Sequence, residues 1–108
     1  MSATTTEYKA FIGGQWVDSA SGETMNVINP ATGDVIARVP RCSAEDVDRA
    51  VAAANEVLPD WLEKTPKERS ELLLKLADVL EDNGEELAQL ESLNVGKPLM
   101  ASRDEMPF

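Results

Sequence analysis

The chain has 108 residues, of which 43% are hydrophobic and 28% are charged, and this composition is typical of one small globular domain. Its 20 acidic and 10 basic side chains give a net charge of −10, which disfavours nucleic acids and anionic membranes as partners. Cys42 is the only cysteine and histidine is absent, so an intrachain disulfide and a zinc cluster are excluded. We find no pattern of a signal peptide or membrane span and expect a cytoplasmic protein.

Residues 8–39 are predicted to form strands joined by turns. Gly13-Gly14 separates the apolar pairs of "FIGGQWV", and a two-residue hairpin turn needs the positive φ that glycine adopts without strain. Two further short strands, "TMNVI" and "VIARV", are separated by the turn sequence "NPATGD". Residues 1–7 are polar and are expected to form a flexible tail.

Three helices are predicted to follow, over about residues 43–58, 66–82 and 85–95. Ser43 and Asp46 have capping-box spacing at the start of the first helix, and Pro59 is expected to end or kink that helix near Leu58. Thr65 is expected to cap the second helix, and Gly96 to end the third. Strands followed by helices predict an α+β fold.

The second helix is apolar on more than one side. Leucines at 72, 73, 76 and 80 follow the helical repeat, whereas Leu74 lies on the opposite side. Burying one leucine contributes roughly 1.5–3 kcal/mol, so several uncovered leucines would weaken the fold. We expect the isolated chain to be marginally stable or to self-associate.

The stretch "LESLNVGKPL" contains a Gly-Lys pair, which raises the question of a phosphate site. A phosphate-binding loop needs earlier glycines and a Ser or Thr after the lysine, but Gly96-Lys97 follows Asn94-Val95 and precedes Pro98. The pair also follows a helix, whose exposed carbonyls repel anions. A helix stop is therefore favoured.

Other reactive side chains lack partners. Cys42 precedes a helix but has no histidine to act as its base, so we interpret it as a linker thiol. Paired carboxylates at 45–46 and 85–86 are interpreted as helix first-turn charges, and those at 81–82 as solvated surface. The sequence assembles no nucleophile, base and oxyanion site.

The order of five segments resembles the N-terminus of aldehyde dehydrogenases: "FIGGQWV", "VINPATGDVIARVP", "SAEDVDRAVAAA", "TPKERSELLLKLADVLEDNGEELAQLESLNVGKPL" and "DEMP". The resemblance covers about residues 8–108 and implies part of that family's α/β cofactor-binding domain. Within the fourth segment, "LLKLADVLEDNGEELAQLESLNVGKPL" (residues 73–99) is most similar to γ-aminobutyraldehyde dehydrogenases, with betaine-aldehyde dehydrogenases next.

The resemblance implies NAD(P)-dependent oxidation of an aldehyde, such as γ-aminobutyraldehyde, to a carboxylic acid by a homo-oligomeric enzyme. In that family a cysteine thiolate attacks the aldehyde, a hydride passes to the nicotinamide, and a glutamate-activated water releases the acid. Those residues, an oxyanion asparagine and the dinucleotide-binding glycines stand downstream in the family, and Cys42 does not match the nucleophile. We therefore expect an inactive fragment that binds no NAD or NADP alone and packs against the remaining fold.

The alternative is a stand-alone acidic interaction or assembly module derived from this N-terminus. The gene sequence following Phe108 would distinguish the two hypotheses, because a continuing reading frame favours a fragment. The aldehyde, the choice between NAD and NADP and the oligomeric state are not fixed by these residues.

The resemblance also implies a monovalent cation site. Many family members bind a structural cation through backbone carbonyls just before "NP" and an acidic side chain just before "GKP". The matching positions are Val27, Ile28 and Asn94, where asparagine keeps an oxygen but lacks the usual charge. The other interpretation of Asn94 is a residue that suits a helix C-terminus.

Overall fold

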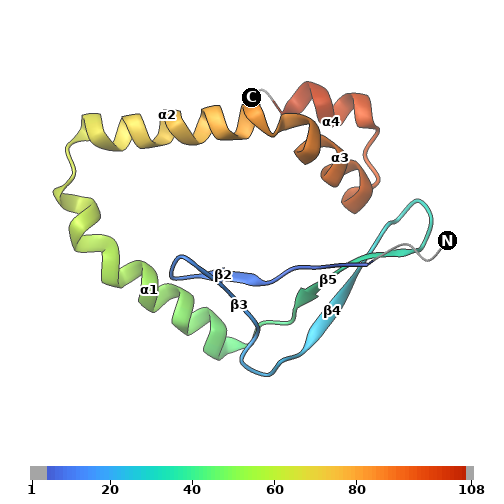
Figure 1. The fold of residues 1–108 in the computed structure, drawn as a ribbon, viewed down its shortest axis with the longest axis horizontal. Coiled ribbons are helices and arrows are strands. Elements are labelled where there is room, and N and C mark those ends of the chain that lie inside the picture. The colour runs from blue at the N-terminus through green and yellow to red at the C-terminus, as the bar shows by residue number, and fades with distance from the viewer. Residues whose placement is uncertain (1–4, 107–108) are drawn as a thin grey trace. The chain divides into compact units, whose positions relative to one another are not determined.

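The computed structural model describes residues 5–106 and divides the chain into two compact units. Within these residues, the first unit runs to Ile28 and then from Val35 to Glu63. The second unit contains Asn29–Asp34 and the chain from Lys64 onward. Each unit is described by itself, and Figure 1 shows the elements of both.

The first unit contains five strands and one helix within the described residues. They are β1 (Thr6–Glu7), β2 (Ala10–Ile12), β3 (Gln15–Val17), β4 (Thr24–Ile28), β5 (Val35–Pro40) and α1 (Ala44–Glu63). Strands β2 and β3 form an antiparallel hairpin, as predicted, and Gly13 and Gly14 at its turn have φ values of 60° and 77°. Both glycines thus adopt the left-handed backbone that such a turn requires.

A three-stranded sheet in the order β1-β5-β4 forms the rest of the strand region. Strand β5 pairs antiparallel with β4 and parallel with β1, so Thr6 and Glu7, which were predicted to belong to a flexible tail, are paired with Ala37 and Arg38. The rest of the predicted tail that precedes residue 5 lies outside the described residues. Ala37, at the centre of β5, is the buried apolar residue of this sheet.

Helix α1 continues through Pro59 to Glu63, so the predicted end near residue 58 is wrong. Proline lacks the N–H that would bond to the carbonyl of Asn55, four residues earlier. Asn55 is an exposed residue, so the missing bond lies on a part of α1 that faces solvent. A single lost bond on a solvent-facing helix has not ended it.

The second unit contains three helices within the described residues: α2 (Pro66–Asp82), α3 (Gly84–Val95) and α4 (Leu99–Glu105). The first two confirm the predicted helices, and Thr65 and Glu68 form the complete capping box at the start of α2. Helix α4 was not predicted. Its 7 residues are too few to show a helical repeat, and contacts with α3 hold it in place.

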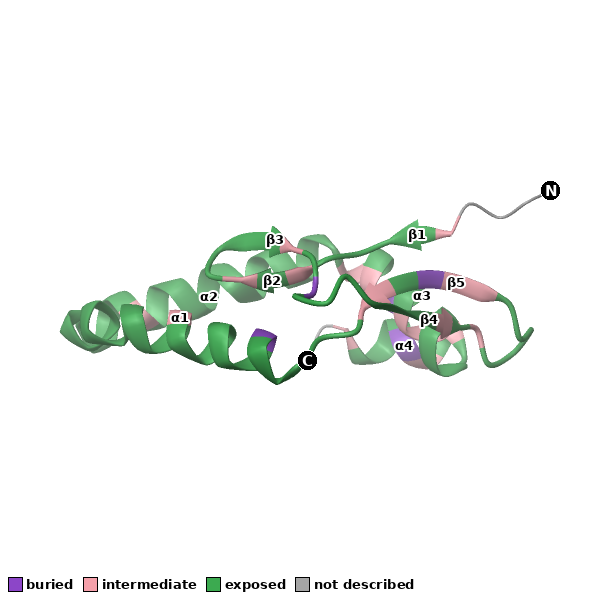
Figure 2. Cartoon of the chain, turned by 90° about the horizontal axis from the view of Figure 1, so that it is seen from below, coloured by how far each residue is buried: buried purple, intermediate pink, exposed green. Residues whose placement is uncertain are grey.

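Few apolar side chains are buried in either unit, as the prevalence of green in Figure 2 shows. Ala88 on α3 is fully buried, whereas Leu90 and Leu93 remain 42% and 44% exposed. No residue of α2 is buried, which confirms that this helix needs more cover than its unit supplies. Among residues 5–106, no helix combines the length and the apolar character needed to cross a bilayer.

Candidate functional site

The turn Asn29–Asp34 satisfies its own backbone groups. The N–H of Asn29 donates to the carbonyl of Asp34 at 2.8 Å, and the N–H of Gly33 donates to the carbonyl of Asn29 at 2.8 Å. The side-chain oxygen of Asn29 accepts from the N–H of Ala31 at 2.9 Å. The sequence "NPATGD" therefore forms a fixed loop, because asparagine and glycine supply the bonds and the positive φ that it needs.

This turn meets the end of helix α3. Gly96 caps α3 in the left-handed conformation, with φ 75° and an N–H bond to the carbonyl of Ser92 at 3.0 Å. A Cβ placed on Gly96 would lie 3.1 Å from Cγ of Pro30. The "NP" and "GKP" sequences are therefore in contact within one unit. Pro30 and Gly96, which make this contact, are 66 positions apart in the chain (96 − 30).

Lys97 is held by carboxylates. Its Nζ donates to Glu91 on α3 at 3.1 Å and to Glu105 on α4. These hydrogen bonds, first that to Glu105 and then that to Glu91, raise the pKa of Lys97 above its ordinary value. A lysine with two acidic partners at a helix C-terminus is not a phosphate ligand, and the prediction of a helix stop at Gly96 is confirmed.

A second ion pair joins α3 to α4. The guanidinium of Arg103 donates to both carboxylate oxygens of Glu85, at 2.8 and 2.6 Å. The hydrogen bond from Arg103, followed by that from Gln89, lowers the pKa of Glu85 to about 2. Sequence analysis interpreted Glu85 only as a first-turn charge, because its partner lies on the helix that was not predicted.

Two hydroxyls meet where α3 and α4 cross. Ser102 is fully buried, and its Oγ lies 3.0 Å from Oγ of Ser92. Small side chains allow the two helices to approach closely, and the hydroxyls satisfy each other there. A surface depression of about 490 Å³ beside this hairpin is lined by Glu81, Gly84, Glu85, Arg103 and Met106. Two of its three charged lining residues, Glu85 and Arg103, are paired with each other.

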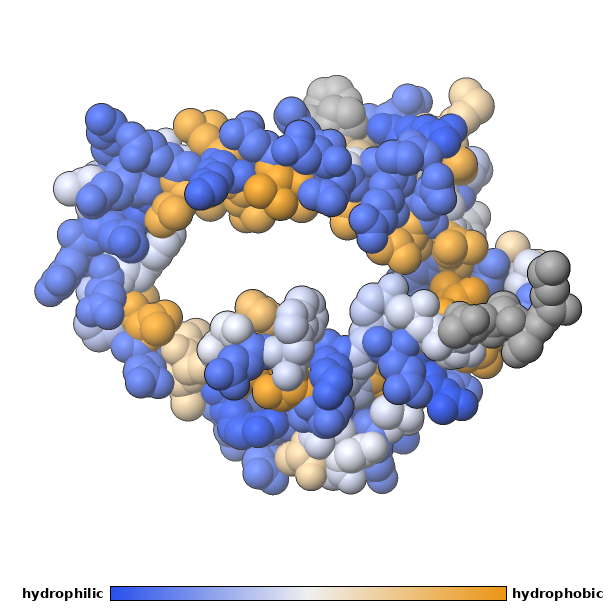
Figure 3. Space-filling view, in the orientation of Figure 1, coloured by the Kyte–Doolittle hydropathy of each residue, from blue (hydrophilic) through white to orange (hydrophobic). Residues whose placement is uncertain are grey.

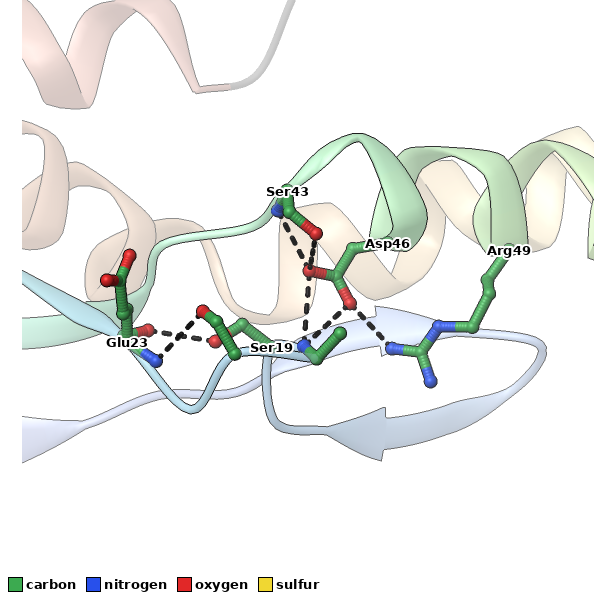
Figure 4. Close-up of polar contacts among 7 residues, drawn as sticks. Ser19, Glu23, Ser43, Asp46 and Arg49 are labelled. Atoms are coloured by element: carbon green, nitrogen blue, oxygen red, sulfur yellow. Dashed lines mark hydrogen bonds and ion pairs between the residues drawn. The ribbon is translucent and has the colours of Figure 1, made fainter.

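In the first unit, Asp46 is a buried carboxylate with four donors. It is only 2% exposed and accepts from the backbone N–H of Ser43 at 2.9 Å and of Ala20 at 3.0 Å. It also accepts from the hydroxyl of Ser43 and from Arg49 at 2.7 Å, and Figure 4 shows these contacts together. The backbone bond from Ser43 is the main cause that lowers the pKa of Asp46.

The capping role predicted for Asp46 is confirmed by its bond to Ser43, but its bond to Ala20 was missed. Ala20 is 26 residues earlier in the chain. No local pattern relates the two positions, although an acidic residue that is paired so fully is expected to be structural. Asp46 thus fixes the loop before β4 to the start of α1.

The proposed cation ligands lie on two elements. Val27 and Ile28 end strand β4, where a register shift in the pairing with β5 interrupts the regular ladder. Asn94 is exposed in the last turn of α3. These positions belong to different units, and the cation site stays a prediction.

No other candidate becomes a reactive site. Cys42 is exposed between β5 and α1, as expected of a linker thiol. Among residues 5–106, no group of three or more Asp, Glu, Cys and His side chains is placed to hold a metal ion. The polar networks described above are contacts that join helices and loops.

Comparison with known proteins gives one consistent result. The model of the aldehyde dehydrogenase family matches residues 16–108. An NAD-dependent aldehyde dehydrogenase from Sinorhizobium meliloti is 39% identical with a TM-score of 0.92, and the match covers 98% of this chain and 22% of that one.

Two further solved structures are similar. An NADP-dependent enzyme from E. coli is 36% identical with a TM-score of 0.91, over 95% of this chain and 21% of that one. A betaine aldehyde dehydrogenase from Staphylococcus aureus, solved with NAD⁺, is 35% identical with a TM-score of 0.87, over 91% and 20%. The chain spans about a fifth of the length of these structures.

Proposed function

Because this chain belongs to the aldehyde dehydrogenase family, we propose that it is the N-terminal part of an NAD(P)-dependent aldehyde dehydrogenase. The whole enzyme would oxidise an aldehyde to a carboxylic acid. The observation that carries this proposal is the match of 98% of the chain, at 39% identity, to an NAD-dependent aldehyde dehydrogenase. The comparisons give no support to the alternative of a stand-alone acidic module.

The described residues do not include the kind of loop that binds a dinucleotide cofactor. The glycine-rich cradle for a pyrophosphate stands between the end of a strand and the start of a helix. Within residues 5–106, the segment that joins a strand to a helix is residues 41–43, with the sequence Arg-Cys-Ser. We therefore assign no cofactor contact to these residues, and we propose that the chain alone is inactive.

An aminoaldehyde such as γ-aminobutyraldehyde is the substrate that we propose for the whole enzyme. The proposal rests on the sequence of residues 73–99, and the similarity to a betaine aldehyde dehydrogenase supports it, since that substrate name denotes an ammonium-bearing aldehyde. If the reading frame continues, its full product should oxidise γ-aminobutyraldehyde at a higher kcat/KM than an uncharged aldehyde of equal length. Equal values would contradict this substrate class.

A monovalent cation site at the carbonyls of Val27 and Ile28 and the side chain of Asn94 is part of the same proposal. The ladder irregularity at Val27 and Ile28 supports it, because a β-bulge disrupts backbone pairing. The position of Asn94 near the C-terminus of α3 also favours a cation. Asn94→Asp should increase the potassium affinity of the whole enzyme, and an unchanged affinity would contradict the assignment.

A chimera tests the proposed function. The matched N-terminal segment of the Sinorhizobium meliloti relative is replaced by this chain, in frame, and NAD-dependent oxidation of an aldehyde is measured. We expect an active chimera, whereas the 108-residue chain alone is expected to reduce no NAD⁺. An insoluble or inactive chimera, beside an active parent prepared in the same way, would contradict the proposal.

A further inference from the structure

Asn83 is the residue between helices α2 and α3, and its side chain serves the first of them. Its Nδ2 donates to the carbonyl of Val79, in the last turn of α2, at 2.8 Å. The backbone N–H of Asn83 donates to the same carbonyl at 3.3 Å. Within residues 5–106, no bond from an N–H of α3 to this side chain is present, although asparagine often caps the start of a helix in that way.

The junction of the two helices is open to water. Asn83 is exposed, and so are the acidic side chains at positions 81, 82, 85 and 86. Apolar side chains gather along α2 itself (Figure 3). A hydrogen bond from an exposed side chain breaks and re-forms readily, because water can replace it. The amide group of Asn83 is therefore free of Val79 for part of the time.

Gly84 follows Asn83 as the first residue of α3. A helix provides no acceptor for the N–H at this position, and in the described part of the chain no backbone hydrogen bond has the N–H of Gly84 as its donor. Because glycine has no Cβ, its own side does not hinder an approach of its nitrogen to the side chain of Asn83. The pair thus combines an exposed amide group with an unhindered backbone nitrogen beside it.

We propose that Asn83 and Gly84 form a self-modification site, at which Asn83 is deamidated to an acidic residue. Asparagine is among the thermally labile residues. The backbone nitrogen of Gly84 loses its proton to a base in solution and attacks Cγ of Asn83. A bond from that nitrogen to Cγ forms, the Cγ–Nδ2 bond breaks, and ammonia leaves with a proton from water. A second water molecule opens the cyclic imide at either carbonyl, which gives aspartate or isoaspartate.

The reaction reverses which helix the side chain can cap. A carboxylate has no N–H to donate, so it cannot bond to the carbonyl of Val79. It accepts hydrogen bonds instead, and the N–H groups at the start of α3 have no acceptor within their helix. Deamidation of Asn83 therefore loosens the last turn of α2 and favours the first turn of α3. This modification goes beyond the proposed function and does not depend on it.

Ageing of the purified chain tests the site. The 108-residue chain is kept for days at mildly alkaline pH, and tryptic peptides of aged and fresh samples are compared by mass spectrometry. Asn94 precedes valine and is an internal control, because no lysine or arginine lies between Lys75 and Lys97 and one peptide contains both asparagines. We expect Asn83 to deamidate about tenfold faster than Asn94, with isoaspartate among the products.

Gly84→Ala isolates the role of the glycine. The substitution should fit, because a Cβ on Gly84 would lie 3.9 Å from Cβ of Met106, and Gly84 is not among the glycines with positive φ. The added methyl group should hinder the attack and slow deamidation of Asn83 about tenfold, while circular dichroism matches that of the parent chain. The comparison of Asn83 with Asn94 in the parent chain decides the matter if this variant does not fold.

Asn83→Asp tests the reversal of the cap without ageing. Hydrogen exchange should be about twofold to tenfold faster across residues 79–83, where a bond is lost, and slower at residues 85–86. Asn55→Asp is the matched control, because it makes the same change at an exposed position of α1. That control should leave exchange across residues 79–83 as in the parent chain.

Each comparison can overturn part of the inference. Equal deamidation rates at Asn83 and Asn94, or an undiminished rate in a folded Gly84→Ala variant, would overturn the modification site. Unchanged exchange across residues 79–83 in Asn83→Asp, or an equal change in Asn55→Asp, would overturn the reversal of the cap.

Discussion

The ring of Pro30 lies against Gly96, so that its Cγ is 3.1 Å from where a Cβ on Gly96 would stand. Pro30 belongs to the turn "NPATGD" and Gly96 to the cap of α3, and both sequences are part of the family resemblance. The contact gives a physical reason for a glycine at this position. A side chain there would need both a positive φ and the space that the proline ring fills.

Replacing Gly96 by alanine should destabilise the 108-residue chain by more than the roughly 1–2 kcal/mol of a left-handed alanine alone. Gly33→Ala is the matched control, because Gly33 has φ 81° in the same unit but no atom within 4 Å of its built Cβ. Urea unfolding measures both free energies. Equal losses would contradict a steric role of Pro30, and adding Pro30→Ala should recover part of the Gly96→Ala loss.

Removing the charge of Asp46 should loosen the loop before β4. Asp46→Asn keeps the size of the side chain but replaces one acceptor oxygen with a donor, which then faces donors from Ala20, Ser43 or Arg49. We expect the melting midpoint to fall by roughly 5–10 °C. Asp48→Asn, an exposed position of the same helix, should change it by about 1–2 °C at most. Similar midpoints for the two variants would show that the carboxylate is not needed.

Acid should weaken the α3–α4 hairpin. The pKa of Glu85 is lowered from 4.5 to about 2 by Arg103, so its contribution to stability is fully present above about pH 4.5 and is lost as the pH falls toward 2. The contribution of Asp46 has the same sign, because its pKa is also lowered, from 3.8. Circular dichroism between pH 2 and 6 should show helix loss in the parent chain.

Glu85→Gln tests the origin of that acid transition. The variant should already be less helical at pH 6 and should lose less helix between about pH 4.5 and 2. Glu86→Gln, in the same first turn, removes a carboxylate that does not pair with Arg103 and should keep the parent profile. An identical pH profile for parent and Glu85→Gln would refute the assignment.

The hydroxyl pair of Ser92 and Ser102 should behave as one unit. Ser102→Ala leaves the hydroxyl of Ser92 without its partner and should cost about 1–2 kcal/mol of unfolding free energy. The double change to alanine should cost less than the sum of the single changes, because neither hydroxyl then remains unpaired. Additive losses in urea unfolding would argue against a direct hydroxyl contact.

Much of the local structure could be predicted from short patterns. The Thr65 capping box, the Gly13-Gly14 hairpin and the Gly96 cap each depend on residues within a few positions, and all three are present. Capping and turn preferences arise from neighbouring backbone groups, which the sequence order fixes. The leucine repeat of α2 likewise predicted that this helix needs further cover.

Other features depended on residues far apart in the chain. Helix α4 forms although its 7 residues show no repeat, since Arg103 and Ser102 contact α3. The proposed cation ligands Val27, Ile28 and Asn94 stay untested, because they belong to separate units. Sequence reasoning had no signal for contacts of this kind.

The sequence by itself determined the strands other than β1, most helix ends, the acidic charge and the family resemblance, because these follow from local backbone preferences and residue order. Only the tertiary structure decided that Asp46 binds Ala20, that Lys97 pairs with carboxylates and that Pro30 contacts Gly96. Those contacts depend on which distant segments meet, and periodicity within one segment carries no information about its partner.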